Sequence, residues 1–281
     1  MTDHVEGKVV VVTGAASGFG RIVATMLGER RARVVVADVD ADGLAATEAA
    51  IRDAGGEVAA RRTDVTDRAD MAALAAFAVE RFDAVDVLVN NAGIMPLAFF
   101  ADHARAADAW DRCIDVNLRG VLNGIMAVHD QMITQGRGQV VNVSSIYGNF
   151  PVAGSAVYTA TKAAVNVLSE ALRVESQGRI KVTTVKPTGV PGTNLGAGIV
   201  NGDAMVGILG QNAAAFGEKA AIAWGPDDTD EKRALTDPED IRYWAIAPEE
   251  LAAQIVYVID QPWGVSISDI TVRASGDPYV L

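Results

Sequence analysis

The hydrophobic positions of the chain alternate between short β-branched runs and longer alanine-rich segments with helical periodicity. The short runs predict strands at Lys8–Thr13, Arg33–Asp38, Glu57–Arg62, Ala84–Asn90, Gln139–Val143, Lys181–Val185 and Ser268–Val272. The segments between them predict helices over about 18–31, 42–54, 67–82, 106–135, 158–177 and 248–259. Strands without polar alternation, separated by helices, indicate a parallel sheet covered on both faces. The pattern therefore predicts an α/β protein with a doubly wound, mostly parallel sheet.

Residues 191–247 depart from this alternation and are expected to form an irregular insertion within a single domain spanning 1–281. Their second half is acidic, and Asp227–Asp240 carries seven acids against two basic residues. One interpretation is a solvated helical arm. The other is a lid over a substrate site, because long inserts at the carboxyl ends of strands often carry recognition. As lid residues, Leu195 and Met205 would contact the substrate. Their apolar side chains would favour an apolar substrate, and a bulky one would be compatible with them.

Charge and composition narrow the class of partner. The chain of 281 residues has 24 Lys and Arg against 36 Asp and Glu, a net charge of −12. This balance disfavours nucleic acid and anionic membranes, which bind through concentrated basic groups. The single cysteine, Cys113, excludes an intramolecular disulfide and a multi-cysteine metal site, and the histidines lack metal-binding spacing, so no metal is expected. No signal-peptide pattern is present and the apolar stretch 187–217 is interrupted by prolines, so a cytoplasmic protein without a membrane span is expected.

A glycine-rich turn lies between the first strand and the first helix, with the sequence Thr13-Gly14-Ala15-Ala16-Ser17-Gly18-Phe19-Gly20. Gly14 permits a sharp turn, Gly18 lets the backbone approach a pyrophosphate, and Gly20 allows close helix packing. The helix N-terminus behind them offers free N–H groups and a positive dipole end. An acidic protein can therefore hold a dinucleotide without lysines. A tight structural connection is the alternative, because the spacing differs from G-x-G-x-x-G.

Asp38, at the end of the second strand, favours NAD as the cofactor. It follows Gly20 by 18 residues, a position from which a carboxylate accepts both adenosine ribose hydroxyls and repels a 2′-phosphate. Neither the glycine turn nor Val39 supplies a cation for that phosphate. Arg61 and Arg62, near the end of the third strand, are placed to reach the adenosine edge, so NADP stays open.

Tyr158 and Lys162 are four residues apart at the start of a predicted helix and share one face. A free tyrosine, with a pKa of about 10, is a poor acid or base at neutral pH. A nearby ammonium group stabilises the phenolate and is expected to lower that pKa. Ser144 and Ser145 end the fifth strand upstream, where sheets of this type present catalytic groups.

Together these motifs resemble the short-chain dehydrogenase/reductase family. The matching elements, in order, are Thr13-Gly14-x-x-x-Gly18-x-Gly20, Asn90-Asn91-Ala92-Gly93, Asn117, Ser145 and Tyr158-x-x-x-Lys162. The resemblance covers nearly the whole chain, from about Gly7 to Val272, and implies a Rossmann fold that binds a nicotinamide dinucleotide.

The resemblance also implies a role for each matching position. Tyr158 would be the general acid/base, and Ser145 would hydrogen-bond the substrate oxygen. Lys162 would bind the nicotinamide ribose and lower the tyrosine pKa, and Asn117 would hold a water in a proton relay through Lys162. Other cofactor contacts would come from Gly14, Ser17, Gly18, Phe19, Gly20, Asp38, Asp64, Val65, Asn91, Ala92, Gly93, Pro187, Val190 and Thr193.

The segment after the sixth strand departs from the family pattern. Thr188 follows Pro187 where the family usually has glycine, and the threonine expected at the nicotinamide carboxamide comes one residue late, as Thr193. A positive φ at Thr188 would cost energy, because its side chain is β-branched. We expect a locally altered loop that keeps the cofactor site.

The sequence thus predicts an oxidoreductase that transfers a hydride between NAD(H) and a secondary alcohol or its ketone. The expected partner is that small molecule, and the resemblance implies a homo-oligomer, either a dimer or a tetramer. An NADP-dependent ketone reductase is the nearest alternative. A dinucleotide-binding regulatory protein without turnover is a more distant one.

Overall fold

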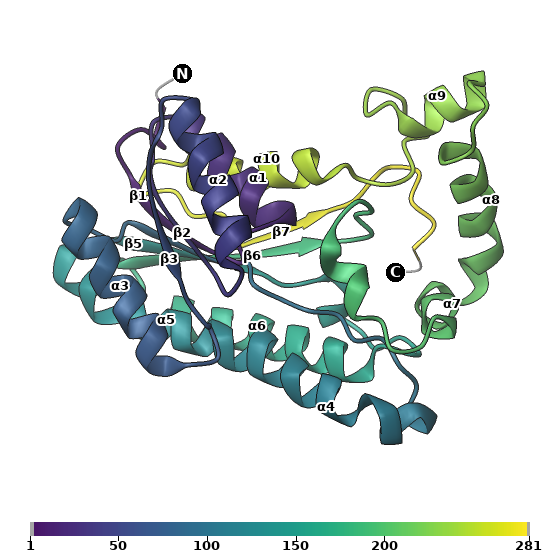
Figure 1. Cartoon of the computed structure of the whole chain (residues 1–281), viewed down its shortest axis with the longest axis horizontal. Helices are drawn as coiled ribbons and strands as arrows, with labels where there is room; N and C mark the ends of the chain where they lie inside the picture. The colour runs from purple at the N-terminus through teal and green to yellow at the C-terminus, as the bar shows by residue number, and fades with distance from the viewer. Residues whose placement is uncertain (1–2, 280–281) are drawn as a thin grey trace.

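Seven parallel strands form one sheet in the computed structural model of the protein, which describes residues 3–279 (Figure 1). The strands are β1 (Val9–Thr13), β2 (Arg33–Asp38), β3 (Glu57–Arg62), β4 (Val87–Asn90), β5 (Gly138–Val143), β6 (Ile180–Pro187) and β7 (Asp269–Val272). They are ordered β3-β2-β1-β4-β5-β6-β7 across the sheet. The chain order therefore reverses between β1 and β4, and the carboxyl ends of the strands open a crevice at that point. The predicted doubly wound Rossmann sheet is confirmed.

Helices cover both faces of this sheet. They are α1 (Gly18–Glu29), α2 (Ala41–Asp53), α3 (Arg68–Phe82), α4 (His103–Ile114), α5 (Gly120–Gln135), α6 (Ala156–Glu175), α7 (Asp203–Leu209), α8 (Ala213–Ala223), α9 (Asp230–Thr236) and α10 (Pro248–Ile259). Helices α1 and α10 lie together on one face, and α3, α5 and α6 lie on the other (Figure 1). The long helix predicted over 106–135 is α4 and α5 joined by a π-helical turn, Asp115–Arg119.

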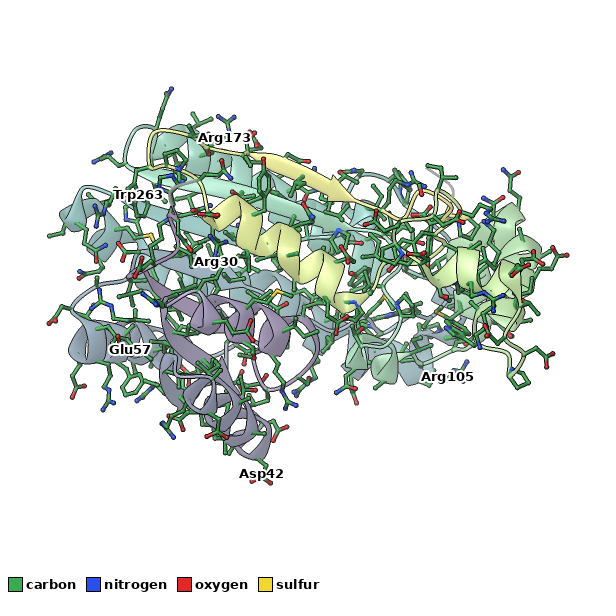
Figure 2. All side chains as sticks on the ribbon, turned by 90° about the horizontal axis from the view of Figure 1, so that it is seen from above. Arg30, Asp42, Glu57, Arg105, Arg173 and Trp263 are labelled. Atoms are coloured by element: carbon green, nitrogen blue, oxygen red, sulfur yellow. The ribbon has the colours of Figure 1, made fainter. Side chains whose placement is uncertain are left out.

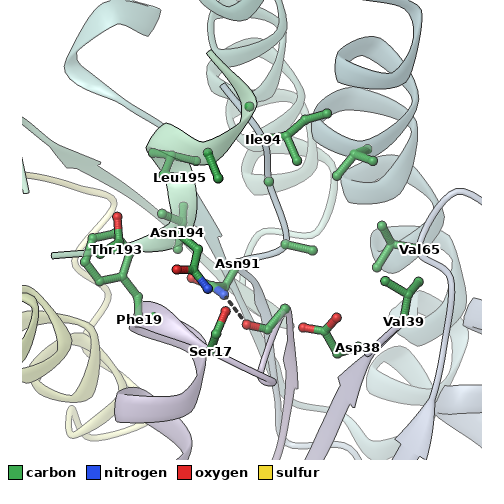
Figure 3. A pocket seen from close by; sticks show the side chains of 18 of the residues that line it. Ser17, Phe19, Asp38, Val39, Val65, Asn91, Ile94, Thr193, Asn194 and Leu195 are labelled. Atoms are coloured by element: carbon green, nitrogen blue, oxygen red, sulfur yellow. Dashed lines mark hydrogen bonds between the residues drawn. The ribbon is translucent and has the colours of Figure 1, made fainter. Parts of the chain in front are cut away.

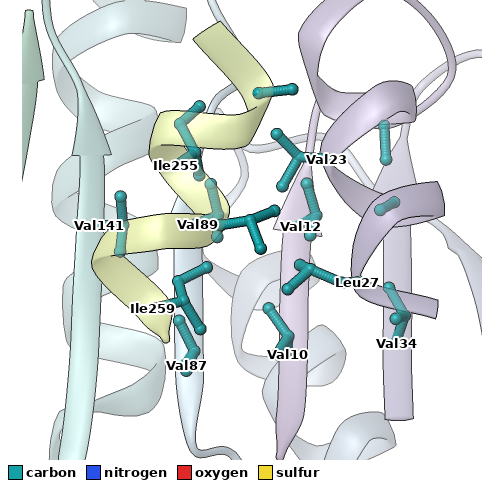
Figure 4. Packing of buried hydrophobic residues seen from close by; sticks show 14 of the residues in the cluster. Val10, Val12, Val23, Leu27, Val34, Val87, Val89, Val141, Ile255 and Ile259 are labelled. Atoms are coloured by element: carbon teal, nitrogen blue, oxygen red, sulfur yellow. The ribbon is translucent and has the colours of Figure 1, made fainter. Parts of the chain in front are cut away.

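Alternate residues of the central strands face the two helical layers. Val10 and Val12 of β1 pack in one cluster with Leu27 of α1 and Ile255 of α10 (Figure 4). Val11, between them, belongs to the cluster formed with α3 and α5 on the opposite face. All three valines are at most 1% exposed. The strands lack polar alternation because both of their faces are buried.

The 191–247 segment is mostly helical, which agrees with the interpretation as a helical arm and not with an irregular course. It contains α7, α8, α9 and a short 3₁₀ turn, Asn194–Gly198. Its helices bury apolar side chains: Ile208 packs near Tyr147, and Phe216 packs against Trp244 with ring centres 5.1 Å apart. Tertiary packing of this kind stabilises short helices that glycine-rich composition alone does not favour.

Seen from above, Trp263 lies at the end of the molecule opposite α8 and α9 (Figure 2). Within residues 3–279, no helix is long and apolar enough to cross a membrane.

Candidate active site

A cavity of about 510 Å³ opens at the carboxyl edge of the sheet (Figure 3). Residues that end or follow six strands contribute to it: Gly14 after β1, Asp38 in β2, Thr63 after β3, Asn91 after β4, Val143 in β5 and Pro187 in β6. This edge is where ligands bind in doubly wound sheets, since loops and helix N-termini converge there.

The glycine turn has the geometry of a phosphate cradle. Gly14 has φ +66°, and a β-carbon there would lie 2.8 Å from Cα of Ala92. At Gly20 a β-carbon would overlap the carbonyl group of Gly14. Gly18, in contrast, has room for a β-carbon, whose nearest atom would be Cβ of Thr193, 3.8 Å away, but its φ of +52° favours glycine. The first-turn N–H groups of α1 receive no side-chain cap from Ser17, so the residues present fit the phosphates of a dinucleotide.

Asp38 lines the cavity and is held in place by the backbone around it. Its Oδ2 accepts the N–H of Ala16 at 3.0 Å, and its Oδ1 accepts the N–H of Asp40 at 3.1 Å. The two arginines that left NADP open do not line the cavity. The Arg62 side chain donates to the Val39 carbonyl, and the Arg61 guanidinium lies over the Phe77 ring.

The structure brings Tyr158 and Lys162 together at the cavity wall. Both are in the first turns of α6, and they are 4% and 5% exposed. The Lys162 ammonium group lies over the Tyr158 ring, 5.8 Å from its centre, and donates to the Val143 carbonyl at 2.8 Å. The predicted shared face of the two side chains is confirmed.

Burial controls the ionisation of this pair. It raises the pKa of Tyr158 to about 12, and a hydrogen bond with the Ser145 side chain opposes that rise. Burial also lowers the pKa of Lys162 to about 8. The expected lowering of the tyrosine pKa is therefore wrong for this structure. The low-dielectric surroundings disfavour the phenolate, and the Lys162 ammonium group faces the ring.

The two serines after β5 point in different directions. Ser145 Oγ accepts the N–H of Tyr147 at 3.2 Å. The Ser145 side chain is also hydrogen-bonded to the Tyr158 hydroxyl. Ser144 Oγ donates to Oδ1 of Asn166 at 2.7 Å and contacts the Lys162 carbonyl at 3.1 Å, so its hydroxyl faces α6. The one-residue offset therefore separates the two hydroxyl groups, and Ser145 is the serine beside the tyrosine.

Asn117 occupies the π-helical turn, and its side chain holds the loop after β4. Its Oδ1 accepts the N–H of Ile94, and its Nδ2 donates to the Ile94 carbonyl, each at 2.9 Å. The amide also reaches Cys113 and Thr161. Asn117 does not line the cavity, so its side chain positions Ile94 and the adjoining Gly93. The water relay stays a prediction.

The loop after β6 is altered as expected, but Thr188 is not strained. Among residues 3–279, the non-glycine residues with positive φ are Arg31 and Asp83. The Thr188 hydroxyl donates to Oδ2 of Asp277 at 2.9 Å. Val190 packs against the core cluster of α1 and α10 and does not line the cavity, in contrast to the cofactor contact predicted for it. The shifted turn directs it to the core.

The other predicted cofactor residues mostly line the cavity. Those that do are Gly14, Ser17, Gly18, Phe19, Asp38, Asp64, Val65, Asn91, Ala92, Gly93, Tyr158, Lys162, Pro187 and Thr193. Gly20 does not line the cavity; its lack of a side chain lets α1 pack closely against the Gly14 carbonyl group. Leu195 also lines the cavity, whereas Met205, the second predicted substrate residue, packs in the apolar cluster around Tyr147. Hydrogen bonds from Thr66 hold the pKa of the Asp64 carboxyl below its ordinary value.

Sequence reasoning missed part of the lining, namely Val39, Thr63, Ile94, Arg112, Val116, Val143, Ser144, Asn194, Ala197 and Gly198. Val39 and Thr63 directly follow strand ends, a signal that identifies lining positions in a doubly wound sheet. Arg112 and Val116 come from the helical region before α5 and carry no motif. Within residues 3–279, no cluster of His, Cys, Asp and Glu could hold a metal ion.

Comparisons with known proteins agree with this geometry. A family model described as short chain dehydrogenase matches residues 8–203. An uncharacterized oxidoreductase of Listeria monocytogenes is 32% identical over 278 residues, which is 98% of this chain and 99% of that protein. The 2,5-dichloro-2,5-cyclohexadiene-1,4-diol dehydrogenase of Sphingobium indicum is 37% identical over 191 residues, 68% of this chain and 76% of that protein.

Two solved structures share the fold along nearly the whole chain. An alcohol dehydrogenase from the archaeon Thermococcus sibiricus, complexed with 5-hydroxy-NADP, superposes with a TM-score of 0.76 over 97% of this chain and 98% of that one. Its identity of 20% supports the fold alone. A short chain dehydrogenase/reductase from Burkholderia phymatum, in complex with NAD, superposes with a TM-score of 0.74 at 28% identity, over 96% of this chain and 90% of that one.

Proposed function

Because the chain belongs to the short-chain dehydrogenase family and is an oxidoreductase, we propose that it transfers a hydride between NAD(H) and a secondary alcohol or its ketone. One observation carries this proposal. Tyr158 and Lys162 line the same cavity as the glycine turn and Asp38, and the Ser145 side chain is hydrogen-bonded to Tyr158 beside it. An acid/base group and a dinucleotide cradle therefore lie within one site.

Each of these residues has a distinct task in the proposed reaction. The glycine turn and the N-terminus of α1 bind the phosphates, Asp38 binds the adenosine ribose, and Lys162 binds the nicotinamide ribose. The bound nicotinamide ring supplies or accepts the hydride. Ser145 donates a hydrogen bond to the substrate oxygen, and the Tyr158 hydroxyl gives that oxygen a proton in reduction or takes one in oxidation.

The pKa values of the pair set its protonation states at neutral pH. With its pKa raised to about 12 by burial, Tyr158 keeps the proton that ketone reduction requires, but it is a weaker acid than a free tyrosine. Alcohol oxidation needs the phenolate, so its rate is expected to rise with pH. Lys162, with its pKa lowered to about 8, carries its charge at neutral pH and loses it in mildly alkaline solution.

The choice of NAD rests on Asp38. Its carboxylate lies at the end of β2 on the cavity wall, and neither Arg61 nor Arg62 lines the cavity. A 2′-phosphate at that position meets the Asp38 carboxylate, and the neighbouring Arg62 side chain donates to the Val39 carbonyl and does not line the cavity. The experiment is a panel of secondary alcohols and ketones assayed with both cofactors by nicotinamide absorbance. A higher kcat/KM with NADH than with NADPH is expected. An NADPH preference contradicts this use of Asp38, and NADH binding without turnover on any substrate contradicts the enzyme proposal.

We also propose that residues 191–247 act as a lid over an apolar substrate. The turn Asn194–Gly198 lies against the cavity, with Leu195, Ala197 and Gly198 in its lining. The Sphingobium relative is named for a cyclic diol, which supports an alcohol as the substrate class. Limited proteolysis with and without NADH tests the lid. Protection of 191–198 by NADH is expected, and unchanged cleavage contradicts it.

A homo-oligomer is the last part of the proposal. Helices α4 to α6 expose a set of large apolar side chains, Ile114, Leu122, Met126, Val167 and Val174, each at least 38% exposed. Surfaces of this kind often mark contacts between protein chains. Sedimentation of wild type and Val167→Glu is the test. A dimer or tetramer that dissociates in the variant is expected, and a monomeric wild type contradicts the proposal.

A further inference from the structure

Residues 273–279 run from the end of β7 into the space between the sheet and α8 (Figure 1). The segment is tied to the loop after β6, because Asp277 accepts the Thr188 hydroxyl at 2.9 Å. Arg273 forms an ion pair with the other oxygen of Asp277, whose side chain is 1% exposed. Thr188, the residue that departs from the family pattern, therefore fixes this segment beside the cavity.

Tyr279 carries the segment into the apolar cluster near the site. Its phenol ring packs directly on Gly189, where a β-carbon would overlap the ring. The ring contacts Tyr147 and Phe216 edge-on, with centres 6.3 and 6.0 Å apart. Burial, followed by the charge of Asp277, raises the pKa of Tyr279 to about 12. The hydroxyl is therefore neutral in ordinary solution, and the side chain acts as a bulky apolar group.

This ring contacts two segments that adjoin the reacting centre, at Tyr147 and at Gly189. Tyr147, its partner, donates its N–H to Ser145, the residue beside the Tyr158 hydroxyl. Pro187, two residues before Gly189, lines the cavity, whereas Ser145, Tyr147 and Tyr279 do not. The apolar cluster that contains Tyr279 therefore adjoins the cavity, because Tyr158 belongs to both.

On the basis of the proposed function, we propose that Tyr279 is a specificity-determining residue, whose ring backs the wall of the substrate pocket from behind Tyr147 and Gly189 and so limits the bulk of the substrate. The position suits this role because the surrounding contacts hold the ring firmly. Lys219 and Asn212 donate to the carbonyls of Gly276 and Pro278, so the wall is attached to the helical segment as well as to Thr188.

The test compares kcat/KM for two secondary alcohols of different bulk, cyclohexanol and the bicyclic borneol, with NAD. Tyr279→Ala is expected to raise the borneol to cyclohexanol ratio about tenfold or more, because it removes a whole ring from the wall. Tyr279→Phe keeps the ring and is expected to keep the ratio. Tyr257→Ala, a tyrosine on α10 that is 51% exposed, is the matched control and is expected to change nothing. An unchanged ratio in Tyr279→Ala overturns the proposal.

A second measurement separates this proposal from the proposed function. Amide hydrogen exchange of residues 145–149 and 188–192 is expected to accelerate in Tyr279→Ala and to stay unchanged in Tyr279→Phe, whether or not any alcohol is oxidised. If wild type turns over neither alcohol nor any ketone in the wider panel, the proposed function fails. The exchange result then tests the role proposed for the Tyr279 ring. Equal exchange rates in Tyr279→Ala and wild type overturn that proposal.

Discussion

Two buried lysines lie at opposite edges of the same sheet, and their surroundings differ in one decisive way. Lys162 is at the carboxyl edge and Lys181 is near the amino end of β6; they are 5% and 9% exposed. Burial lowers the pKa of each to about 8. The pKa values alone therefore do not distinguish a reacting group from a structural one.

Their partners do distinguish them. Lys181 donates to three carbonyl groups, of Gln261, Pro262 and Val265, at 3.1–3.4 Å. Its ammonium group also lies 5.3 Å from the centre of the Trp263 ring, which Lys8 and Arg137 approach at 4.6 and 5.0 Å.

Lys162 has one carbonyl partner, Val143, and faces the cavity with its remaining N–H groups. At the amino edge, the Lys181 ammonium group bonds three carbonyls and holds the loop after α10. At the carboxyl edge, the Lys162 ammonium group bonds one carbonyl and has N–H groups left for a ligand.

The largest expected effect is at the carboxyl edge. Replacing Tyr158 with phenylalanine removes the proton donor and keeps the ring, so kcat is expected to fall about 10²- to 10⁴-fold. Binding of NADH, followed by its fluorescence, should persist because the glycine turn is untouched. Retained turnover in Tyr158→Phe contradicts the assigned acid/base.

The second prediction exchanges the two lysines of the comparison for methionine. Lys162→Met is expected to lower kcat/KM about a hundredfold or more and to leave the free energy of unfolding little changed, since an apolar side chain replaces a buried charge. Lys181→Met is expected to lower the free energy of unfolding by about 1–3 kcal/mol, because three carbonyls lose a donor, and to keep kcat/KM. Urea unfolding and steady-state kinetics on both variants test this difference between the two lysines. Similar profiles for the two variants would remove the contrast between the edges.

A smaller effect is expected for Asp38→Asn. Asparagine keeps an oxygen for the backbone N–H groups of the glycine turn and removes the charge that faces a 2′-phosphate. The ratio of kcat/KM for NADH over NADPH is expected to fall about tenfold, equivalent to about 1.4 kcal/mol. Glu57→Gln, at the exposed start of β3, is the control. A ratio that stays the same in both variants shows that another group selects the cofactor.

The last prediction concerns pH and the amino edge. The pKa of Lys181 is lowered from 10.5 to about 8 on folding, so the unfolded chain binds more protons than the folded chain between these values. This lysine therefore makes the free energy of unfolding rise with pH across that window. Lys181→Met should show a shallower rise than wild type in urea unfolding at several pH values. Equal slopes in the two proteins would contradict the lowered pKa.

The sheet and the core of the site could be predicted from the sequence because their signals are local. Apolar runs such as Arg33–Asp38 match the observed strand to the residue, and the spacing of Tyr158 and Lys162 places them on one helical face. The glycine turn was predictable because its glycines occupy positions with a positive φ or with a close approach of other backbone atoms.

The rest depends on contacts between distant parts of the chain. Thr188 is explained by Asp277, which lies 89 residues away. The pKa of Tyr158 depends on how deeply the folded chain buries it, so its direction could not be read from the neighbouring lysine. Met205 and Val190 carry apolar side chains that suit a pocket or a core equally well, and only the fold shows that they pack inside.

The bond between Asp38 and the glycine turn means that cofactor choice and turn shape are not independent traits. The carboxylate oxygens accept the N–H groups of Ala16 and Asp40. If Asp38 selects NAD as proposed, a lineage that changed to NADP by losing Asp38 would at the same time lose the acceptor that shapes the turn. A change of cofactor is therefore expected mainly through side chains at position 38 that still accept a hydrogen bond. This requirement restricts the substitutions that change the cofactor and keep the turn.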